Sequence, residues 1–221
     1  MTDAGSSRHG ADYPFGAAAG SGLLRADGNW VDVAPGQDWP GRIPLVAVGS
    51  NAVPEVLYAK LAAAVATCPL GDVPFDPTPV TGLGVAHSAH VSPGGYVPTT
   101  PLADRGRTRR LVVSWFFAEQ LAVLDRTEPN YVRTALPASA GVPGAQVYVS
   151  RWGVLAPGGR PVAPATQAEV HRVLAGDAEL GRLLPLDDPQ AAVAALRAPG
   201  MAEQVRSRLQ VIGWVLPTGL V

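Results

Sequence analysis

The sequence has little cysteine, little lysine and almost no net charge. Its single cysteine, Cys68, excludes an internal disulfide framework and a cysteine-based zinc site, and we interpret it as a buried apolar residue. Lys60 is the only lysine, and the net charge of −1 provides no basic surface for nucleic acid or an anionic membrane. No apolar run approaches the ~20 residues of a membrane span, and no basic-then-apolar leader is visible. We therefore expect a cytoplasmic protein with neither nucleic-acid nor membrane partners.

Apolar residues, by contrast, are abundant. They make up 47% of the 221 residues, which is enough for a sizeable core. We expect three parts: a partly disordered N-terminal arm over 1–40, a main domain over 41–160, and a helical extension over 161–221 packed on that domain. Aromatic residues between 13 and 40 indicate that part of the arm packs as irregular chain.

Hydrophobic patterning and turn residues divide the chain into expected elements. Proline and glycine residues between 69 and 79 predict a loop, and Arg105-Gly106-Arg107 predicts a turn. The strands expected from apolar and β-branched runs are 43–48, 80–91, 96–102, 110–116, 131–136 and 145–152. The helices expected from periodicity and capping residues are 54–66, 118–125, 166–174, 188–197 and 201–209. Strands with one early helix and then a helical tail are typical of an α+β fold.

The first candidate site is the turn Val48-Gly49-Ser50-Asn51, where a strand gives way to a helix at Pro54. A junction of this kind directs backbone N–H groups and the positive end of the helix dipole at one point, where a carboxylate or carbonyl oxygen can bind. Glycine and asparagine are also ordinary turn residues. The pattern alone therefore leaves a plain turn open.

The second candidate is Glu128, which follows a short expected helix and precedes Pro129. The C-terminal end of a helix is unfavourable for a negative charge, and this favours a carboxylate that exchanges protons. We expect Glu128 to face the Gly49-Ser50-Asn51 turn. The alternative is a surface glutamate paired with Arg126 or Arg133.

Other polar residues point to no further chemistry. His87 and His90 are three residues apart on an expected strand, where they would face opposite ways, so we predict no metal site. We expect His171 to be exposed, and we interpret the arginines of 105–110 as a solvated loop rather than a phosphate site. The absence of a Gly-x-Ser-x-Gly elbow argues against a serine hydrolase.

Four short motifs follow one another along the chain. They are Val48-Gly49-Ser50-Asn51, Leu124-Asp125-Arg126-Thr127-Glu128, Tyr131-Val132-Arg133 and Val147-Tyr148-Val149. Their order and spacing resemble the gamma-glutamylcyclotransferase-like superfamily, and the resemblance covers about residues 43–155. Val48 stands where the family has tyrosine, and Pro129 stands where glycine is common.

The resemblance implies a small mixed β-barrel with surrounding helices, acting on a small gamma-glutamyl amine without cofactor or metal. Glu128 would be the general acid/base, taking a proton from the substrate's α-amino group and returning it to the departing amine as 5-oxoproline forms. The substrate-binding residues would be Val48, Gly49, Ser50, Asn51 and Tyr131.

The missing family tyrosine leaves a second hypothesis open, a non-catalytic small-molecule binding module on the same barrel. A third hypothesis treats the aromatic arm and the helical tail as a docking or dimer surface. The sequence predicts no particular oligomeric state.

Overall fold

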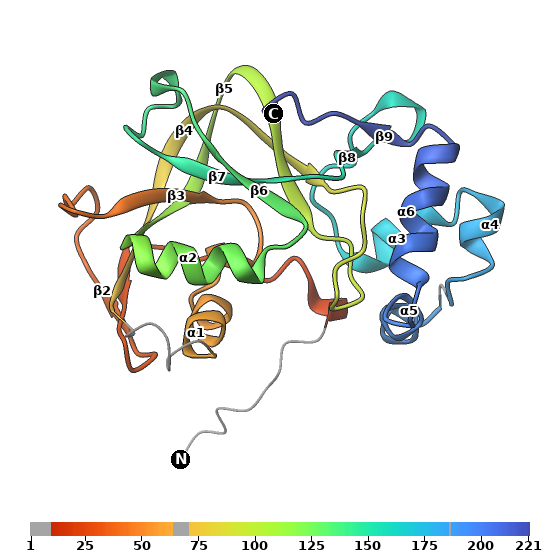
Figure 1. The fold of residues 1–221 in the computed structure, drawn as a ribbon, viewed down its shortest axis with the longest axis horizontal. Coiled ribbons are helices and arrows are strands. Elements are labelled where there is room, and N and C mark those ends of the chain that lie inside the picture. Colours follow the sequence, from red (N-terminus) through yellow and green to blue (C-terminus); the bar gives the residue numbers. More distant parts are fainter. Residues whose placement is uncertain (1–9, 64–70, 186) are drawn as a thin grey trace. The chain divides into compact units, whose positions relative to one another are not determined.

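The computed structural model describes residues 10–63, 71–185 and 187–221. Their contacts define two units that alternate along the chain (Figure 1). The strand unit contains Phe15–Val85, Thr100–Arg151 and Thr218–Val221. The helical unit contains the segment ending at Pro14, together with Ala86–Thr99 and Trp152–Pro217.

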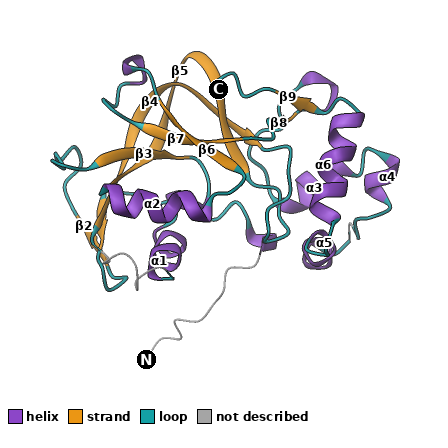
Figure 2. Cartoon of the chain, viewed as in Figure 1, coloured by secondary structure: helices purple, strands orange, loops and turns teal. Residues whose placement is uncertain are grey.

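A mixed sheet of seven strands forms most of the strand unit (Figure 2). The strands are β1 (Gly22–Leu24), β2 (Trp30–Asp32), β3 (Ile43–Ala47), β4 (Val73–His87), β5 (Thr99–Phe116), β6 (Tyr131–Ala135) and β7 (Gln146–Ser150). Their order is β2-β1-β4-β5-β3-β7-β6. β3 and β7 are parallel, whereas β3 is antiparallel to β5 and β6 is antiparallel to β7. Within the described residues, the end strands β2 and β6 do not pair to close a barrel.

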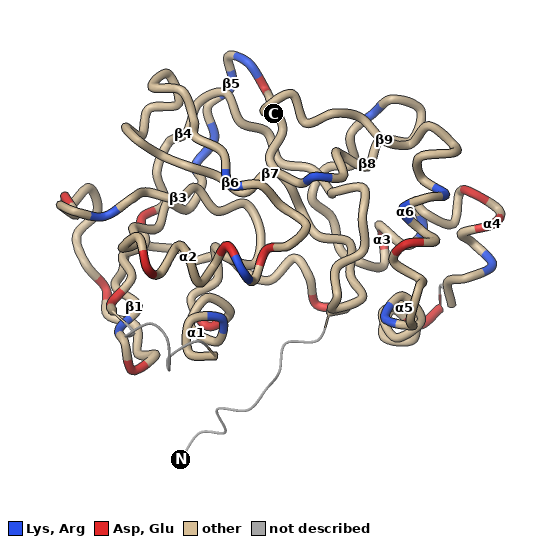
Figure 3. Tube along the Cα trace, in the orientation of Figure 1, with Lys and Arg blue, Asp and Glu red and all other residues tan. Residues whose placement is uncertain are grey.

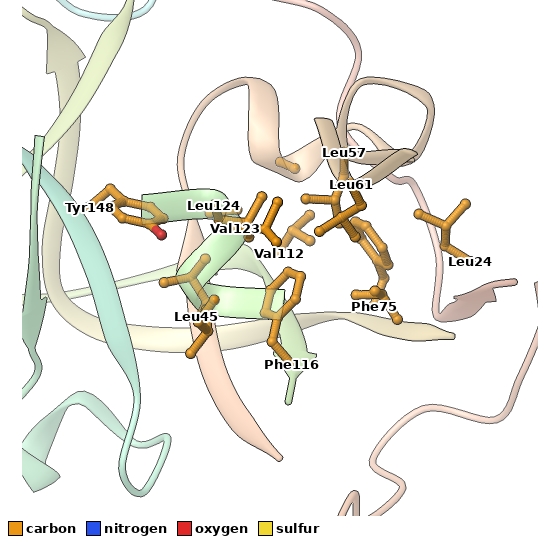
Figure 4. Close-up of a cluster of buried hydrophobic side chains, with 14 residues drawn as sticks. Leu24, Leu45, Leu57, Leu61, Phe75, Val112, Phe116, Val123, Leu124 and Tyr148 are labelled. Atoms are coloured by element: carbon orange, nitrogen blue, oxygen red, sulfur yellow. The ribbon is translucent and has the colours of Figure 1, made fainter. Parts of the chain in front are cut away.

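Two helices pack on the sheet, α1 (Pro54–Ala62) and α2 (Ala118–Thr127). Their apolar sides are buried in one cluster with side chains from β3, β4, β5 and β7 (Figure 4). Leu57 and Leu61 come from α1, and Leu121 and Leu124 come from α2. This shared core holds the two helices against each other, and it sets the C-terminal end of α2 close to the turn that precedes α1.

The helical unit has a separate core. It contains α3 (Gln167–Leu174), α4 (Ala178–Gly181), α5 (Pro189–Leu196), α6 (Met201–Val211) and the antiparallel pair β8 (Val154–Leu155) and β9 (Val215–Leu216). Thr166 and Glu169 form the predicted capping box of α3, and Asp188 caps α5 with Pro189 in the first turn. These local signals explain why the helices begin where the sequence predicted.

Most predicted elements are present, and the α+β class is confirmed. The predicted strand 43–48 corresponds to β3, and the helices predicted after residue 117 correspond to α2, α3, α5 and α6. The helix predicted over 54–66 corresponds to α1, which ends at Ala62. Residues 64–70, with the predicted buried position of Cys68, lie outside the described part of the chain. The short helix α4 was not predicted.

The loop predicted between 69 and 79 is wrong, because β4 begins at Val73 and includes Pro74, Pro77 and Pro79. A proline interrupts a sheet only where its missing N–H is needed by a neighbouring strand. β1 pairs with β4 over Val73–Phe75 and then ends, so the rest of β4 has one side without β1. Pro77 and Pro79 are tolerated there, whereas Pro74 lies opposite Leu23 of β1, and sequence alone does not show where a neighbouring strand stops.

The strands predicted at 96–102 and 110–116 form one strand, β5, which continues through the turn predicted at 105–107. Gly106 has a φ of +79°, a conformation that glycine adopts without steric cost. The chain therefore bends at Gly106 without leaving the sheet.

The N-terminal arm is more regular than expected. Instead of irregular chain, residues 22–32 supply the edge strand β2 and its neighbour β1. Trp30 packs edge-on against Phe75 of β4, with ring centroids 5.5 Å apart, so this aromatic residue of the arm does pack on the sheet. In the part of the chain described, no helix is long and apolar enough to cross a membrane.

Candidate functional site

The candidate site begins at the turn between β3 and α1. After Ala47 the chain passes through a single 3-10 turn, Ser50–Ala52, and α1 starts at Pro54. The N–H groups of Ala52 and Val53 donate to the carbonyls of Gly49 and Ser50, at 2.9 and 3.2 Å. Ser50 and Asn51 come before these two donors in the chain, and the hydrogen bonds of the turn do not use their N–H groups.

Glu128 is held at the end of α2 by a second tight turn. Its carbonyl oxygen accepts the Tyr131 N–H at 3.0 Å, which closes a turn over Glu128-Pro129-Asn130-Tyr131. Proline suits the second position of such a turn, because its φ is already set near the required value. Pro129, one of the departures from the family pattern, is therefore compatible with the local fold.

The two turns meet through side chains, as the sequence predicted. Asn51 donates from Nδ2 to Glu128 Oε1 at 3.0 Å. Lys60 Nζ lies 2.6 Å from the same Glu128 oxygen and 2.7 Å from Asn51 Oδ1. Lys60 Nζ also donates to Ser50 Oγ at 3.2 Å. The side chains of Ser50, Asn51, Lys60 and Glu128 are thus joined by hydrogen bonds to one another, and we call this group the amide–acid–amine cluster.

The charged side chains of the cluster are partly buried. The side chain of Glu128 is 12% exposed and that of Lys60 is 20% exposed. At this depth an ion pair is screened less than one at the surface. Small solutes therefore have limited but real access to the charged atoms.

The sequence reasoning did not identify Lys60 as part of the site. Lys60 lies in the last turn of α1, yet it contacts residues that precede the helix, because helical side chains are directed toward the N-terminus. The signal that could have found it is its position as the only lysine, on the helix that starts at the candidate turn.

A second set of contacts fixes the end of α2. Arg133 of β6 binds Asp125 through Nε and Nη2, at 2.8 and 2.9 Å, and the hydroxyl of Tyr148 in β7 donates to Asp125 at 2.9 Å. The hydrogen bond from Arg133 lowers the pKa of Asp125. Burial, and then the bond to Asp125, raise the pKa of Tyr148.

These contacts give three of the sequence motifs a structural role, because each contributes one residue to the Asp125–Arg133–Tyr148 clamp. The clamp fixes Glu128, which lies three residues beyond Asp125. Figure 3 shows acidic and basic positions alternating along this end of α2. Because Arg133 binds Asp125 and Glu128 binds Lys60, the predicted alternative pairing of Glu128 with Arg133 is wrong.

Two of the predicted substrate-binding residues, Val48 and Tyr131, are not members of the amide–acid–amine cluster. Val48 is partly buried against Val46 and its neighbours in a second core, whereas Leu45 and Ala47 pack in the core beneath α1 and α2. Because side chains alternate along a strand, Val48 is directed to the face of the sheet opposite these helices. Tyr131 packs against the α1–α2 core and supports Glu128 through its backbone.

His87, His90 and His171 belong to the helical unit. His171 is 1% exposed, so the predicted exposure of His171 is wrong. Gln167, Val170, His171 and Leu174 are all buried on one side of α3, and this helical spacing is the signal that could have predicted it. Among the described residues, no group of three His, Cys, Asp or Glu side chains is placed to hold a metal ion.

Comparison with known proteins identifies no relative, because no family model, curated protein or solved structure matches the chain. The resemblance to the gamma-glutamylcyclotransferase-like superfamily therefore remains a prediction from the motifs.

Proposed function

We propose that the chain is a cytoplasmic, cofactor-independent enzyme of the gamma-glutamylcyclotransferase-like type, which releases 5-oxoproline or a related cyclised acyl group from a small gamma-glutamyl amine. The observation that carries the proposal is the 3.0 Å hydrogen bond between Asn51 and Glu128. It joins two motifs 77 residues apart, which are the two motifs to which the resemblance assigns substrate binding and proton transfer.

In the proposed reaction, the N–H groups of Ser50 and Asn51 bind a carbonyl or carboxylate oxygen of the substrate. Glu128 accepts a proton from the substrate's α-amino group, and the amine attacks the γ-carbonyl of the same molecule. Glu128 then protonates the departing amine. Because nucleophile and electrophile belong to one molecule, ring closure gains from proximity, and one positioned acid/base is sufficient.

The proposal extends to the type of fold. The observation behind it is the seven-stranded mixed sheet with α1 and α2 packed on it. In this proposal, the sheet corresponds to the small barrel of the superfamily.

Lys60 is the main obstacle to this reaction. Its ammonium group lies 2.6 Å from Glu128 Oε1, which is the position that the α-amino group of a substrate needs. The substrate's own ammonium group therefore has to replace Nζ, or Lys60 has to lose its charge. The oxygens of Ser50, Asn51 and Glu128 suit this exchange, because they already surround one primary ammonium group.

The same ion pair favours a second candidate function, a non-catalytic module that binds a small molecule. In this case Lys60 stays paired with Glu128, and Val48 reflects the loss of the hydroxyl and aromatic ring of the family's tyrosine. A module of this kind binds gamma-glutamyl compounds without consuming them.

Measurement of 5-oxoproline release from a panel of gamma-glutamyl amines distinguishes the two functions. The enzyme hypothesis predicts turnover by the wild-type chain and a loss of at least about 100-fold in Glu128→Gln, the usual scale for a general acid/base. Glu119→Gln is a matched control, because Glu119 is exposed in the first turn of the same helix. Turnover that survives in Glu128→Gln would remove Glu128 from the mechanism. Binding without turnover would favour the module.

A further inference from the structure

The amide–acid–amine cluster contains the three groups of an amide-forming reaction within the chain itself. Lys60 is a primary amine, Asn51 is a carboxamide, and Glu128 touches both. One oxygen, Glu128 Oε1, lies 2.6 Å from the Lys60 nitrogen and 3.0 Å from the Asn51 amide nitrogen. The Lys60 nitrogen is also 2.7 Å from the Asn51 amide oxygen.

From this arrangement we propose that Lys60 and Asn51 form a covalent isopeptide cross-link, with Glu128 as the acid/base that transfers the proton. The reaction requires no external substrate, so it does not depend on the proposed function. It uses atoms that are already in hydrogen-bonding contact.

The steps balance within the cluster. The Lys60 ammonium gives one proton to Glu128 Oε1 and becomes a neutral amine. Its nitrogen then attacks Cγ of Asn51, whose carbonyl oxygen it already contacts, and a C–N bond forms. Glu128 passes its proton to Nδ2 of Asn51, and the attacking nitrogen gives up one more proton as it becomes an amide. The bond from Cγ to Nδ2 breaks, and the nitrogen leaves with both protons as an ammonium ion. Glu128 ends as a carboxylate, and no oxidant or cofactor is consumed.

The orientation of the asparagine matches this sequence of steps. Its oxygen faces the nucleophile, where the Lys60 hydrogen bond polarises the carbonyl, and its nitrogen faces the acid that protonates the leaving group. The reacting groups are held by the fold, which removes the entropic cost of bringing them together.

The cross-link also has a consequence for Glu128. Acylation converts Lys60 from a cation to a neutral amide, and the Asn51 carboxamide loses the N–H₂ group that bound Glu128. The carboxylate is thereby released from both of its present side-chain partners. The cross-linked chain then has a partly buried acid at the same turn that is no longer paired with Lys60.

The unique lysine makes the test decisive. The mass of the purified full-length chain is expected to be lower than the sequence mass by one ammonia molecule, about 17 Da. A lysine-specific protease cleaves the unreacted, denatured chain once, after Lys60, because no other lysine is present. The cross-linked chain is expected to resist this protease, because an acylated lysine is no longer a substrate.

Two variants serve as controls. Lys60→Arg keeps the positive charge but removes the amine nucleophile, and Glu128→Gln removes the proton carrier at similar size. Both are expected to have their full sequence masses, and denatured Glu128→Gln is expected to be cleaved after Lys60. Circular dichroism shows whether each variant is folded.

Three results would overturn the proposal. The first is a wild-type chain of full mass that is cleaved after Lys60. The second is the loss of ammonia with normal cleavage, since this would indicate reaction of an asparagine with its own backbone. The third is cross-linking in Glu128→Gln, which would exclude Glu128 as the proton carrier.

Discussion

Acidification is predicted to destabilise the chain through its buried histidines. His90 is 3% exposed and its Nδ1 lies 2.6 Å from Ser88 Oγ. Burial, with a smaller contribution from the charge of Arg206, lowers the pKa of His90 from 6.5 to about 3. His171 is also buried, and burial lowers its pKa to about 4. Both imidazoles are therefore neutral in the folded chain at pH 5.

The sign of the effect follows from proton binding. Below pH 6.5 the unfolded chain protonates these histidines and the folded chain does not, so the free energy of unfolding falls as the pH falls. From pH 8 to pH 5, a shift from 6.5 to about 3 costs about 2 kcal/mol for His90. His171 adds a loss of the same sign. The pKa of Asp125 and that of Asp177 are lowered, so their contributions are lost only under more acidic conditions.

Urea unfolding at the two pH values measures this loss, and NMR titration of the imidazole protons shows which histidines remain neutral. His90→Gln keeps a polar side chain at the site but cannot become charged. Its stability is expected to fall by about 2 kcal/mol less than that of the wild type over the same pH interval. Equal losses in both proteins, or a His90 that titrates near its ordinary pKa in the folded state, would refute the reasoning.

Two substitutions test how the strand unit holds the candidate site. Asp125→Asn removes the charged acceptor of Arg133 and Tyr148, and it is expected to lower the free energy of unfolding in urea by about 1–3 kcal/mol. A value near zero would show that the clamp is a solvated ion pair. Leu57→Ala opens a cavity at a residue with 0% exposure and is expected to cost about 2–5 kcal/mol. Leu57→Met is the matched control, and a cost similar to that of alanine would contradict a cavity effect.

Much of the candidate site was predictable because its residues are set by local signals. The Gly49-Ser50-Asn51 turn follows an apolar strand, and Pro54 starts the helix after it. Glu128 follows an amphipathic helix whose length was predicted nearly correctly. The meeting of these two turns could be predicted only from the order of motifs, because nothing local relates residues 77 positions apart.

The missed features depend on neighbours rather than on local sequence. Lys60 reaches the site because of the way α1 packs on the core. Leu57 and Leu61 of α1 share that core with side chains of other elements. The continuity of β5 through Gly106 depends on partners along the strand that a turn-like Arg-Gly-Arg sequence does not reveal. Pro77 and Pro79 of β4 are tolerated because β1 pairs with β4 only as far as Phe75.

The ion pair between Lys60 and Glu128 connects the two proposals made for this site. Lys60 occupies the carboxylate oxygen that a substrate's amine needs, and the isopeptide cross-link removes this cation by converting it to an amide. Lys60→Arg therefore separates the two reactions, because it prevents the cross-link while keeping a positive charge next to Glu128. If turnover requires the cross-link, this variant is inactive although its Glu128 is intact. If a substrate's ammonium group displaces the cation instead, the variant retains activity at a higher KM, because a guanidinium group held by several oxygens is harder to displace.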